Sequence, residues 1–217
     1  MRVWVTREEG ADGPLSTALR NAGLDVVLEP VIERCVVSDV ADEISKLGAD
    51  DWLVLTSAYA IEAVSVEPSR IPRVAVVADP SRKVAEALGF RVELVSSKGD
   101  GKSLFAELRE KVKTGKVCYP RSALVKAPEP WASVEIISPI LYTTQPRPFD
   151  RTVFDRVDVV AVASPSAVNA IGPTDLPLAS IGPSTSAAIR ELGMEPWLES
   201  PEPSFQSLAD GIAKAEG

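Results

Sequence analysis

Four short runs of hydroxyl-bearing residues offer the clearest chemistry in this sequence. Each run follows an apolar stretch and opens a predicted helix: Thr56-Ser57, Pro80-Ser81, Ser164-Pro165-Ser166 and Gly182-Pro183-Ser184-Thr185. The first turn of a helix presents unpaired N–H groups and a positive partial charge, and a serine or threonine there adds a hydroxyl donor. Such a set can bind carboxylates or phosphates without lysine or arginine. For each run the alternative is an ordinary helix cap, because these residue types favour helix starts whatever the function.

The composition excludes several other kinds of site. The 217 residues include no histidine, which removes His-based triads, His-ligated metals and imidazole acid–base catalysis. Cys35 and Cys118 lie far apart and form no metal or redox motif, which favours small buried thiols in a reducing compartment. The sequence holds no GxGxxG, and GDGKS at Gly99–Ser103 lacks the upstream glycine of a phosphate-binding loop. We expect no metal site.

The charge and the hydropathy pattern restrict the partners. A net charge of −8 opposes general nucleic-acid binding, which needs a basic surface. The sequence contains no apolar run near the roughly 18 residues of a membrane span, and the start, MRVWVTREEG, turns polar too early for a secretory signal. We therefore expect a cytoplasmic protein whose partner is a small molecule, with no nucleic acid and no membrane. We also expect a monomer.

Short apolar runs alternate with helical stretches along nearly the whole chain. Helices are predicted, for instance, at Leu15–Ala22, Lys83–Leu88 and Ala187–Leu192. Strands are predicted at Val3–Thr6, Asp25–Glu29, Trp52–Leu55, Val74–Ala78, Val92–Val95, Val117–Tyr119, Val134–Ile137, Val159–Ala163, Leu178–Ile181 and Glu195–Leu198. This alternation is typical of an α/β protein with parallel sheets covered by helices on both faces.

The chain also repeats itself. DWLVLTSAYAIEAV, from Asp51, matches DVVAVASPSAVNAI, from Asp158, and VAVVADPSRKVAEALGFRVEL matches PLASIGPSTSAAIRELGMEPWL. In the second pair Gly193 corresponds to Gly89, 104 positions earlier, and the same offset relates Leu208 to Leu104. Two similar lobes follow from this repeat. We predict that residues 1–33 and 145–217 form one lobe and residues 37–138 the other, with 34–36 and 139–144 as the connecting segments. The function would then lie in the cleft between the lobes.

Six stretches together resemble the uroporphyrinogen-III synthase family: VTREEG, DWLVLTSAYAIEAV, VADPSRKVAEALGF, ILYTT, ASPSAVNAI and SIGPSTSAAIRELG. The resemblance implies two α/β lobes joined by a two-stranded β-ladder, with the active site between them. It implies a lyase of tetrapyrrole (porphyrin and heme) biosynthesis, which closes linear hydroxymethylbilane with inversion of ring D to give uroporphyrinogen III and water. The family uses no metal and no organic cofactor, and its substrate carries eight carboxylates.

The resemblance also assigns site residues. The family's tyrosine falls on Tyr142, which is a candidate proton donor, although a phenol is a weak acid and a strand tyrosine packed at the lobe junction is the alternative. Substrate-binding roles fall on residues of the hydroxyl runs, namely Thr56, Ser57, Ser81, Ser164 and Ser184.

Some positions depart from the family pattern. Tyr59 stands where many members have Asn or Arg, Ala78 replaces a common glycine, and Pro177 takes a place where some have lysine. The stretch from Arg121 to Ile137 matches no family segment. A likeness of fold does not decide function, so the competing hypothesis is a two-lobed, non-enzymatic binding protein for a small anionic metabolite.

Overall fold

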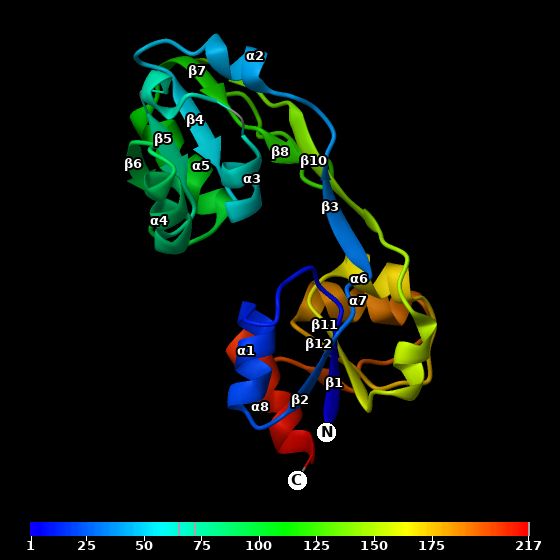
Figure 1. Cartoon of the computed structure of the whole chain (residues 1–217). Coiled ribbons are helices and arrows are strands. Elements are labelled where there is room, and N and C mark those ends of the chain that lie inside the picture. Colours follow the sequence, from blue (N-terminus) through cyan, green and yellow to red (C-terminus); the bar gives the residue numbers. More distant parts are fainter. Residues whose placement is uncertain (65, 72, 217) are drawn as a thin grey trace. The chain divides into compact units, whose positions relative to one another are not determined.

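The computed structural model describes residues 1–64, 66–71 and 73–216, and the chain divides into two compact units (Figure 1). Unit 1 comprises Met1–Glu33 and Thr144–Gly217, and unit 2 comprises Arg34–Thr143. The chain passes from one unit to the other within strands β3 (Ile32–Val36) and β10 (Ile140–Pro146). Residues 34–36 and 139–143 therefore belong to unit 2 and Thr144 to unit 1, whereas the sequence analysis set these segments apart as connections.

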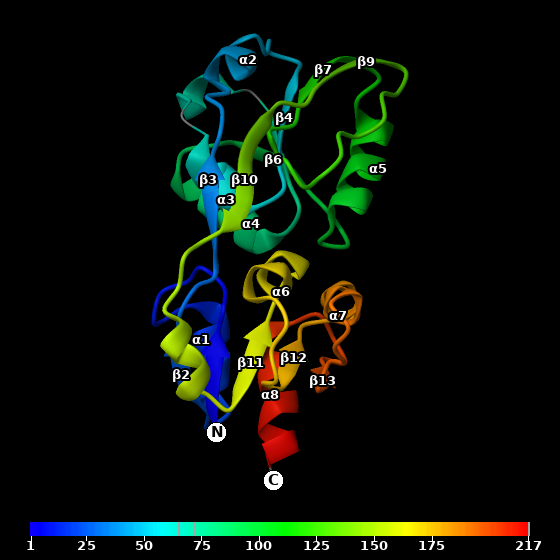
Figure 2. The same cartoon turned by 90° about the vertical axis from the view of Figure 1, so that its right-hand side faces the viewer.

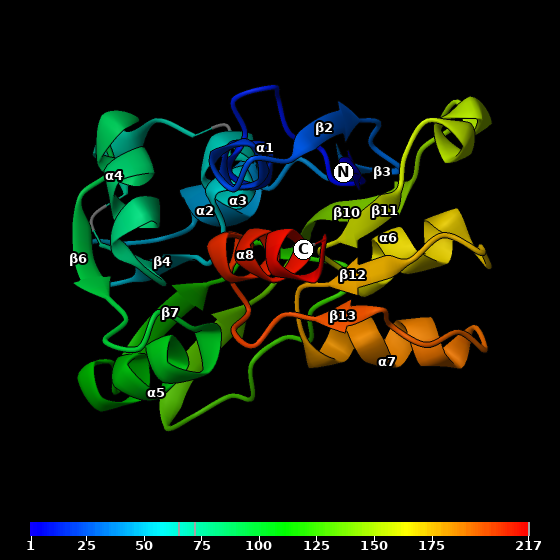
Figure 3. The same ribbon diagram turned by 90° about the horizontal axis from the view of Figure 1, so that it is seen from below.

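Unit 1 is built on a five-stranded parallel sheet with the strand order β13-β12-β11-β1-β2. Its strands are β1 (Arg2–Val5), β2 (Asp25–Leu28), β11 (Val159–Val162), β12 (Leu178–Ser180) and β13 (Leu198–Glu199). Helices α1 (Pro14–Asn21) and α8 (Phe205–Glu216) cover one face, and α6 (Pro165–Ile171) and α7 (Pro183–Glu191) cover the other (Figure 3). The central strand β11 is apolar throughout because both of its faces are buried.

Unit 2 has a second five-stranded parallel sheet, with the order β6-β5-β4-β7-β9. Its strands are β4 (Trp52–Leu55), β5 (Val74–Val76), β6 (Val92–Val95), β7 (Thr114–Cys118) and β9 (Ser133–Ile137). Helices α2 (Ala41–Ser45), α3 (Ala58–Ala63) and α4 (Asp79–Ala87) pack on one face, and α5 (Gly101–Lys111) packs on the other (Figure 2). A 3₁₀ turn at Pro68–Arg70 lies in a connection of unit 2, and another at Arg151–Asp155 lies in a connection of unit 1.

The repeat in the sequence corresponds to a repeat in the structure. Strands β4, β5 and β6 alternate with helices in the same way as β11, β12 and β13 do. In both sheets these three strands take the same places in the strand order, with β4 and β11 at the centre and β6 and β13 at the edge. Gly89 and Gly193 end the matching helices α4 and α7, with φ of 90° and 78°, where a residue without a Cβ is favoured. Leu104 and Leu208 are both fully buried. The predicted fold class, two similar α/β lobes with parallel sheets flanked by helices, is confirmed.

The connecting ladder is larger than the two strands that the resemblance implied. The amide N–H of Val37 donates to the carbonyl of Leu141 at 2.9 Å, and that of Arg147 donates to Val31 at 2.8 Å, so β3 and β10 run antiparallel. A third strand, β8 (Arg121–Ser122), pairs with β10 in parallel. In the sheet of unit 2, β7 and β9 take the places that β1 and β2 take in unit 1. Unit 1 has α1 between these two strands, whereas residues 119–132 of unit 2, all within the described ranges, form β8 and turns and contain no helix.

Candidate functional site

Thr56 and Ser57 stand at the carboxyl end of β4, the central strand of unit 2. Side chains alternate along a strand, and the buried residues of β4 divide accordingly: Trp52 and Val54 belong to one core cluster and Leu53 and Leu55 to the other. Ser57 caps α3, because its Oγ accepts the backbone N–H of Ala60 at 3.1 Å. The two neighbouring hydroxyls therefore face different surroundings.

Each hydroxyl meets a tyrosine. The Oγ1 of Thr56 lies 3.2 Å from the hydroxyl oxygen of Tyr119, which follows β7, the strand that pairs with β4. The Oγ of Ser57 lies 3.2 Å from the hydroxyl oxygen of Tyr142, which lies on β10. We call Thr56–Tyr119 and Ser57–Tyr142 the two phenol pairs. They place two phenols and two aliphatic hydroxyls at one end of one strand, which is where parallel sheets bind their ligands.

Tyr119 is the more deeply buried phenol of the two pairs. It is 4% exposed, and its ring meets that of Phe105 edge-on with a centroid distance of 5.1 Å. Burial raises the pKa of the Tyr119 hydroxyl, and the hydrogen bond with Thr56 opposes that rise only in part. The phenol therefore keeps its proton at neutral pH and can donate it in a hydrogen bond.

Tyr142 is half-buried and is held by a ring contact as well as by Ser57. The ring of Tyr59 meets it edge-on with a centroid distance of 4.8 Å. Tyr59 in turn donates from its hydroxyl to the carbonyl of Arg34 at 3.0 Å, and the Arg34 guanidinium lies 4.6 Å from the centre of the Tyr59 ring. The aromatic residue that departs from the family pattern thus packs against the candidate proton donor.

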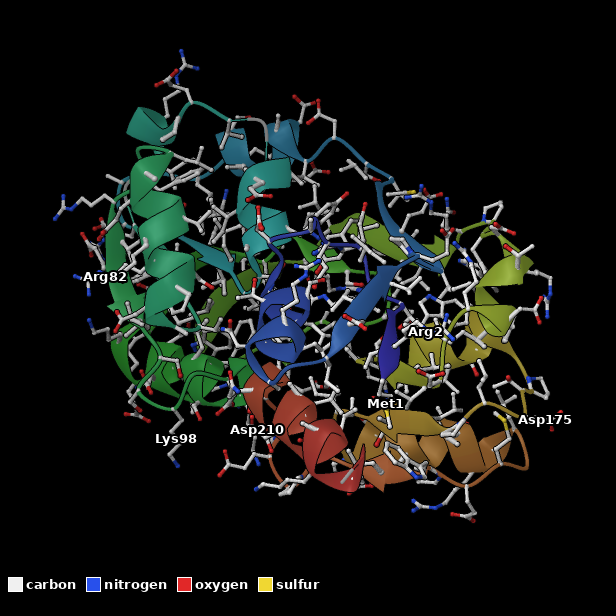
Figure 4. All side chains as sticks on the ribbon, turned by 60° about the horizontal axis from the view of Figure 1, so that its bottom comes forward. Met1, Arg2, Arg82, Lys98, Asp175 and Asp210 are labelled. Carbon is white, nitrogen blue, oxygen red and sulfur yellow. The ribbon has the colours of Figure 1, made fainter. Side chains whose placement is uncertain are left out.

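Ser81 lies in the first turn of α4, after β5, the other strand that pairs with β4. It is buried, with 8% of its surface exposed. The neighbouring cation, Arg82, points outward from α4 (Figure 4), where it pairs with Glu86 at 3.0 Å and with Asp79 at 3.6 Å. Thr56, Ser57 and Ser81 therefore share one edge of the sheet of unit 2, and the arginine beside Ser81 is engaged with its own helix.

In unit 1, Ser164 and Ser184 follow the neighbouring strands β11 and β12. Ser164 caps α6, and its Oγ accepts the N–H of Ala167 at 3.3 Å. Ser184 is exposed in the first turn of α7. The structure places these two serines at one edge of the sheet of unit 1, in the same manner as the hydroxyls of unit 2.

Thr185 is a candidate that the sequence analysis did not choose. It is 1% exposed, and within the described part of the chain its Oγ1 has no hydrogen-bond partner. The offset of 104 that relates Gly89 to Gly193 also relates Ser81 to Thr185, so the repeat contained the signal for this residue. Tyr119 was also missed, because its hydroxyl meets Thr56 only through the pairing of β4 with β7.

The helix starts differ in charge. The described first turns of α3, α6 and α7 hold no acidic side chain. At the start of α1, by contrast, the buried carboxylate of Glu9 accepts hydrogen bonds from the N–H of Ser16 at 2.6 Å and from its hydroxyl at 2.7 Å. At α5 the carboxylate of Asp100 accepts the N–H of Ser103 at 2.8 Å, and this bond lowers the pKa of Asp100. The carboxylates of Glu9 and Asp100 thus accept the free N–H groups at the starts of α1 and α5. The described first turns of α3, α6 and α7 have no such carboxylate.

The described residues contain no group of three or more His, Cys, Asp or Glu side chains that could hold a metal ion. The donor set of both units is made of hydroxyls and backbone amides. Such donors at fixed positions can orient a polyanion through hydrogen bonds, and a phenol among them can donate a proton.

Comparisons with known proteins agree on one family. The family model for uroporphyrinogen-III synthase HemD matches residues 13–210, which span both units. The uroporphyrinogen-III synthase of Synechococcus elongatus is 28% identical over 130 residues, or 55% of this chain and 49% of that protein. The chain thus matches about half the length of this curated relative.

A solved structure shows the same fold. The crystal structure of a mutant uroporphyrinogen III synthase from the extremely thermophilic bacterium Thermus thermophilus aligns over the whole of both chains, with a TM-score of 0.51 and 16% identity. At that identity the likeness concerns the fold alone. The family model, which matches most of the sequence, settles the membership: the chain belongs to the uroporphyrinogen-III synthase family.

Proposed function

We propose that this protein is a uroporphyrinogen-III synthase, a cyclising lyase that converts hydroxymethylbilane into uroporphyrinogen III and water in tetrapyrrole biosynthesis. Family membership across residues 13–210 supports the reaction class. The observation that carries the proposal in this chain is the Ser57–Tyr142 pair, in which a phenol is held at the carboxyl end of the central strand of unit 2.

The reaction needs one proton and a strict conformation. Protonation of the terminal hydroxyl of the bilane lets it leave as water, and the remaining azafulvene is attacked by the substituted carbon of ring D. The resulting spiro intermediate fragments and closes again with ring D turned over, and a proton is lost as the last pyrrole regains its aromaticity. The bare tetrapyrrole closes without inversion, so the protein's main task is to hold the substrate in the productive conformer.

Tyr142 is the proposed proton donor. The Oγ of Ser57 already accepts the N–H of Ala60, and the Ser57 hydroxyl is placed to donate to the oxygen of Tyr142. The hydrogen of Tyr142 then remains available for the leaving hydroxyl of the substrate. The edge-on contact with Tyr59 keeps the phenol ring in place.

We propose that the eight carboxylates of the substrate are bound largely by neutral donors. Thr56 and Ser81 would serve in unit 2, where the hydroxyl of Ser57 acts through Tyr142, and Ser164 and Ser184 would serve in unit 1. The support is the neutral start of α7, where Thr185 keeps a buried hydroxyl without a partner among the described residues. Such a group costs about 1–3 kcal/mol in a folded protein, a cost that a ligand can remove. Donors at a helix start favour an anion over any other ligand.

The remaining expectations stay proposals. We propose a cofactor-independent, monomeric enzyme of the cytoplasm that binds no nucleic acid. The net charge of −8 supports the last point, and a buried free thiol at Cys118, whose pKa burial raises to about 12, suits a reducing compartment. No helix among the described ranges has the length and apolar character to span a membrane. Light scattering tests the monomer, with a dimer mass as the contrary result.

The decisive experiment supplies the protein with enzymatically made hydroxymethylbilane and identifies the porphyrin isomer after oxidation. We expect mainly the type III isomer from the native protein, with or without a chelator, and the type I isomer from heat-denatured protein. Type I alone, in the presence of native protein that binds the bilane, would favour a non-enzymatic receptor. Loss of type III product after chelation would contradict cofactor independence.

A further inference from the structure

The Thr56–Tyr119 pair is built differently from the Ser57–Tyr142 pair. Ser57 has a second partner in the N–H of Ala60, whereas the hydrogen bond that the structure shows for the Thr56 hydroxyl is the one to Tyr119. Tyr119 lies within a core cluster that also contains Trp52 and Val54, and Tyr142 lies at the margin of another cluster. Tyr119 is therefore set in a rigid part of the unit.

Either oxygen of the Thr56–Tyr119 pair can be the donor, and the burial of Tyr119 favours Tyr119 in that role. Tyr119 is 4% exposed, so its hydrogen needs an acceptor within the protein, and the Oγ1 of Thr56 lies 3.2 Å from its oxygen. When Tyr119 donates, the hydrogen of Thr56 must point elsewhere. Thr56 is only half-buried and follows the last residue of β4, so a group beyond the strand end can accept that hydrogen.

The repeat shows that the pair is not a requirement of the scaffold. In the aligned turns DWLVLTS and DVVAVAS, the position of Thr56 in unit 2 is taken by Ala163 in unit 1. Unit 1 forms the same strand and the same serine-capped helix without a hydroxyl at this place. The strand and the helix start do not need Thr56, so its hydroxyl serves Tyr119 and any group that accepts the Thr56 hydrogen beyond the strand end.

We propose that Tyr119 is a positioning residue, which through its hydrogen bond turns the hydroxyl hydrogen of Thr56 toward a carboxylate of the bound tetrapyrrole. This inference rests on the proposed function, because the carboxylate belongs to that substrate. Tyr119 itself contacts no reacting atom in this account. Its effect must pass through Thr56, which makes the proposal testable by the coupling between two substitutions.

The experiment is a double-mutant cycle with Tyr119→Phe and Thr56→Val, measured as KM and kcat for formation of the type III isomer. We expect Tyr119→Phe to raise KM about five- to tenfold and to change kcat by less than about twofold, because a ground-state contact is lost. Thr56→Val should raise KM at least as much. The double variant should be no worse than Thr56→Val alone, since Tyr119 has nothing left to orient.

A control separates positioning from stability. Phe105→Leu removes the ring that meets Tyr119 edge-on but keeps the phenol and Thr56, so it should lower the melting temperature and leave KM unchanged. If Tyr119→Phe folds poorly, Thr56→Val in the native background still has to raise KM. Native KM in either single variant, or multiplied effects in the double variant, would overturn the inference while the native protein still makes type III product. A native protein that makes only type I would overturn the proposed function and the inference with it.

Discussion

Asp51 in unit 2 and Asp158 in unit 1 occupy the same place in the repeat, immediately before β4 and β11, and serve the same purpose. Each carboxylate accepts a backbone N–H from the strand beside its own: Lys116 at 2.7 Å for Asp51 and Arg2 at 2.6 Å for Asp158. At the other end of the two strands the units differ. Unit 2 has Thr56 where unit 1 has Ala163, and all three tyrosines of the chain lie in unit 2.

This comparison separates what holds a sheet together from what a ligand requires. The residues that stay the same, such as Leu104 with Leu208 and Gly89 with Gly193, pack the core or end a helix. At the carboxyl ends of β4 and β11 the helix-capping serine is kept, as Ser57 and Ser164, whereas Thr56 is replaced by Ala163. We infer a division of labour, in which unit 2 supplies the proton and unit 1 only holds the substrate.

The largest expected effect concerns the proposed proton donor. Tyr142→Phe removes one hydroxyl and keeps the ring that packs against Tyr59. We expect kcat for type III formation to fall about 100-fold with little change in KM, the usual loss when a general acid is removed. The measurement is initial rate against bilane concentration. A kcat near the native value would mean that Tyr142 is a packing residue and that the proton comes from elsewhere.

The second prediction compares two neighbours at the start of α7. Thr185→Val removes a buried hydroxyl without a partner in the described structure, so it should stabilise the folded protein by about 1 kcal/mol and raise KM several-fold. Ser184→Ala removes an exposed hydroxyl and should change KM by less than about threefold. Thermal melts and steady-state kinetics test both. A less stable Thr185→Val variant with native KM would show that the hydroxyl serves the fold.

The third prediction concerns the two aspartates, whose substitution should change stability and not the kinetics. Asp51→Ala should cost about 2 kcal/mol of unfolding free energy, because Asp51 is buried and accepts the N–H groups of both Gly48 and Lys116. Asp158→Ala should cost less, since Asp158 is exposed. Urea unfolding at neutral pH measures both. A larger loss from Asp158→Ala would reverse this ranking.

The contribution of Asp158 should also depend on pH. The hydrogen bond from the N–H of Arg2 lowers the pKa of Asp158 below its ordinary value in the folded protein. The stabilisation is therefore fully present above the unfolded-state pKa of about 4 and is lost as the pH falls through the folded-state value. Urea unfolding of the native protein and of Asp158→Ala should thus differ at pH 7 and converge in strong acid. A difference that persists in acid would refute the assignment.

The sequence predicts those parts of the fold that are set by local pattern. Trp52–Leu55 and Val92–Val95 have the bounds expected from their apolar runs, and the repeat predicts two similar units. Val74–Ala78 ends two residues early as a strand, because Ala78 already serves as the N-cap of α4. A short apolar run and a helix cap overlap there, and sequence patterns resolve such boundaries poorly.

Contacts between distant segments could not be predicted. Strand β8 consists of two residues, and its place beside β10 depends on hydrogen bonds such as that from the N–H of Ala123 to the carbonyl of Tyr142 at 2.8 Å. Tyr119 meets Thr56 across 63 residues through the pairing of β7 with β4. Ser184 and Thr185 are adjacent hydroxyl residues of the same kind. Thr185 is buried and Ser184 is exposed because the rotation of α7 about its axis turns Thr185 toward the sheet.

The most direct test of the division of labour compares Ser57→Ala with Ser164→Ala. Both serines cap a helix at the same position of the repeat, so both substitutions should lose about 1 kcal/mol of stability, and this loss cancels in the comparison. We predict that Ser57→Ala lowers kcat about tenfold, because Tyr142 loses its partner, and that Ser164→Ala raises KM with kcat within about twofold of native. Equal changes in kcat for the two variants would contradict the claim that unit 2 alone supplies the proton.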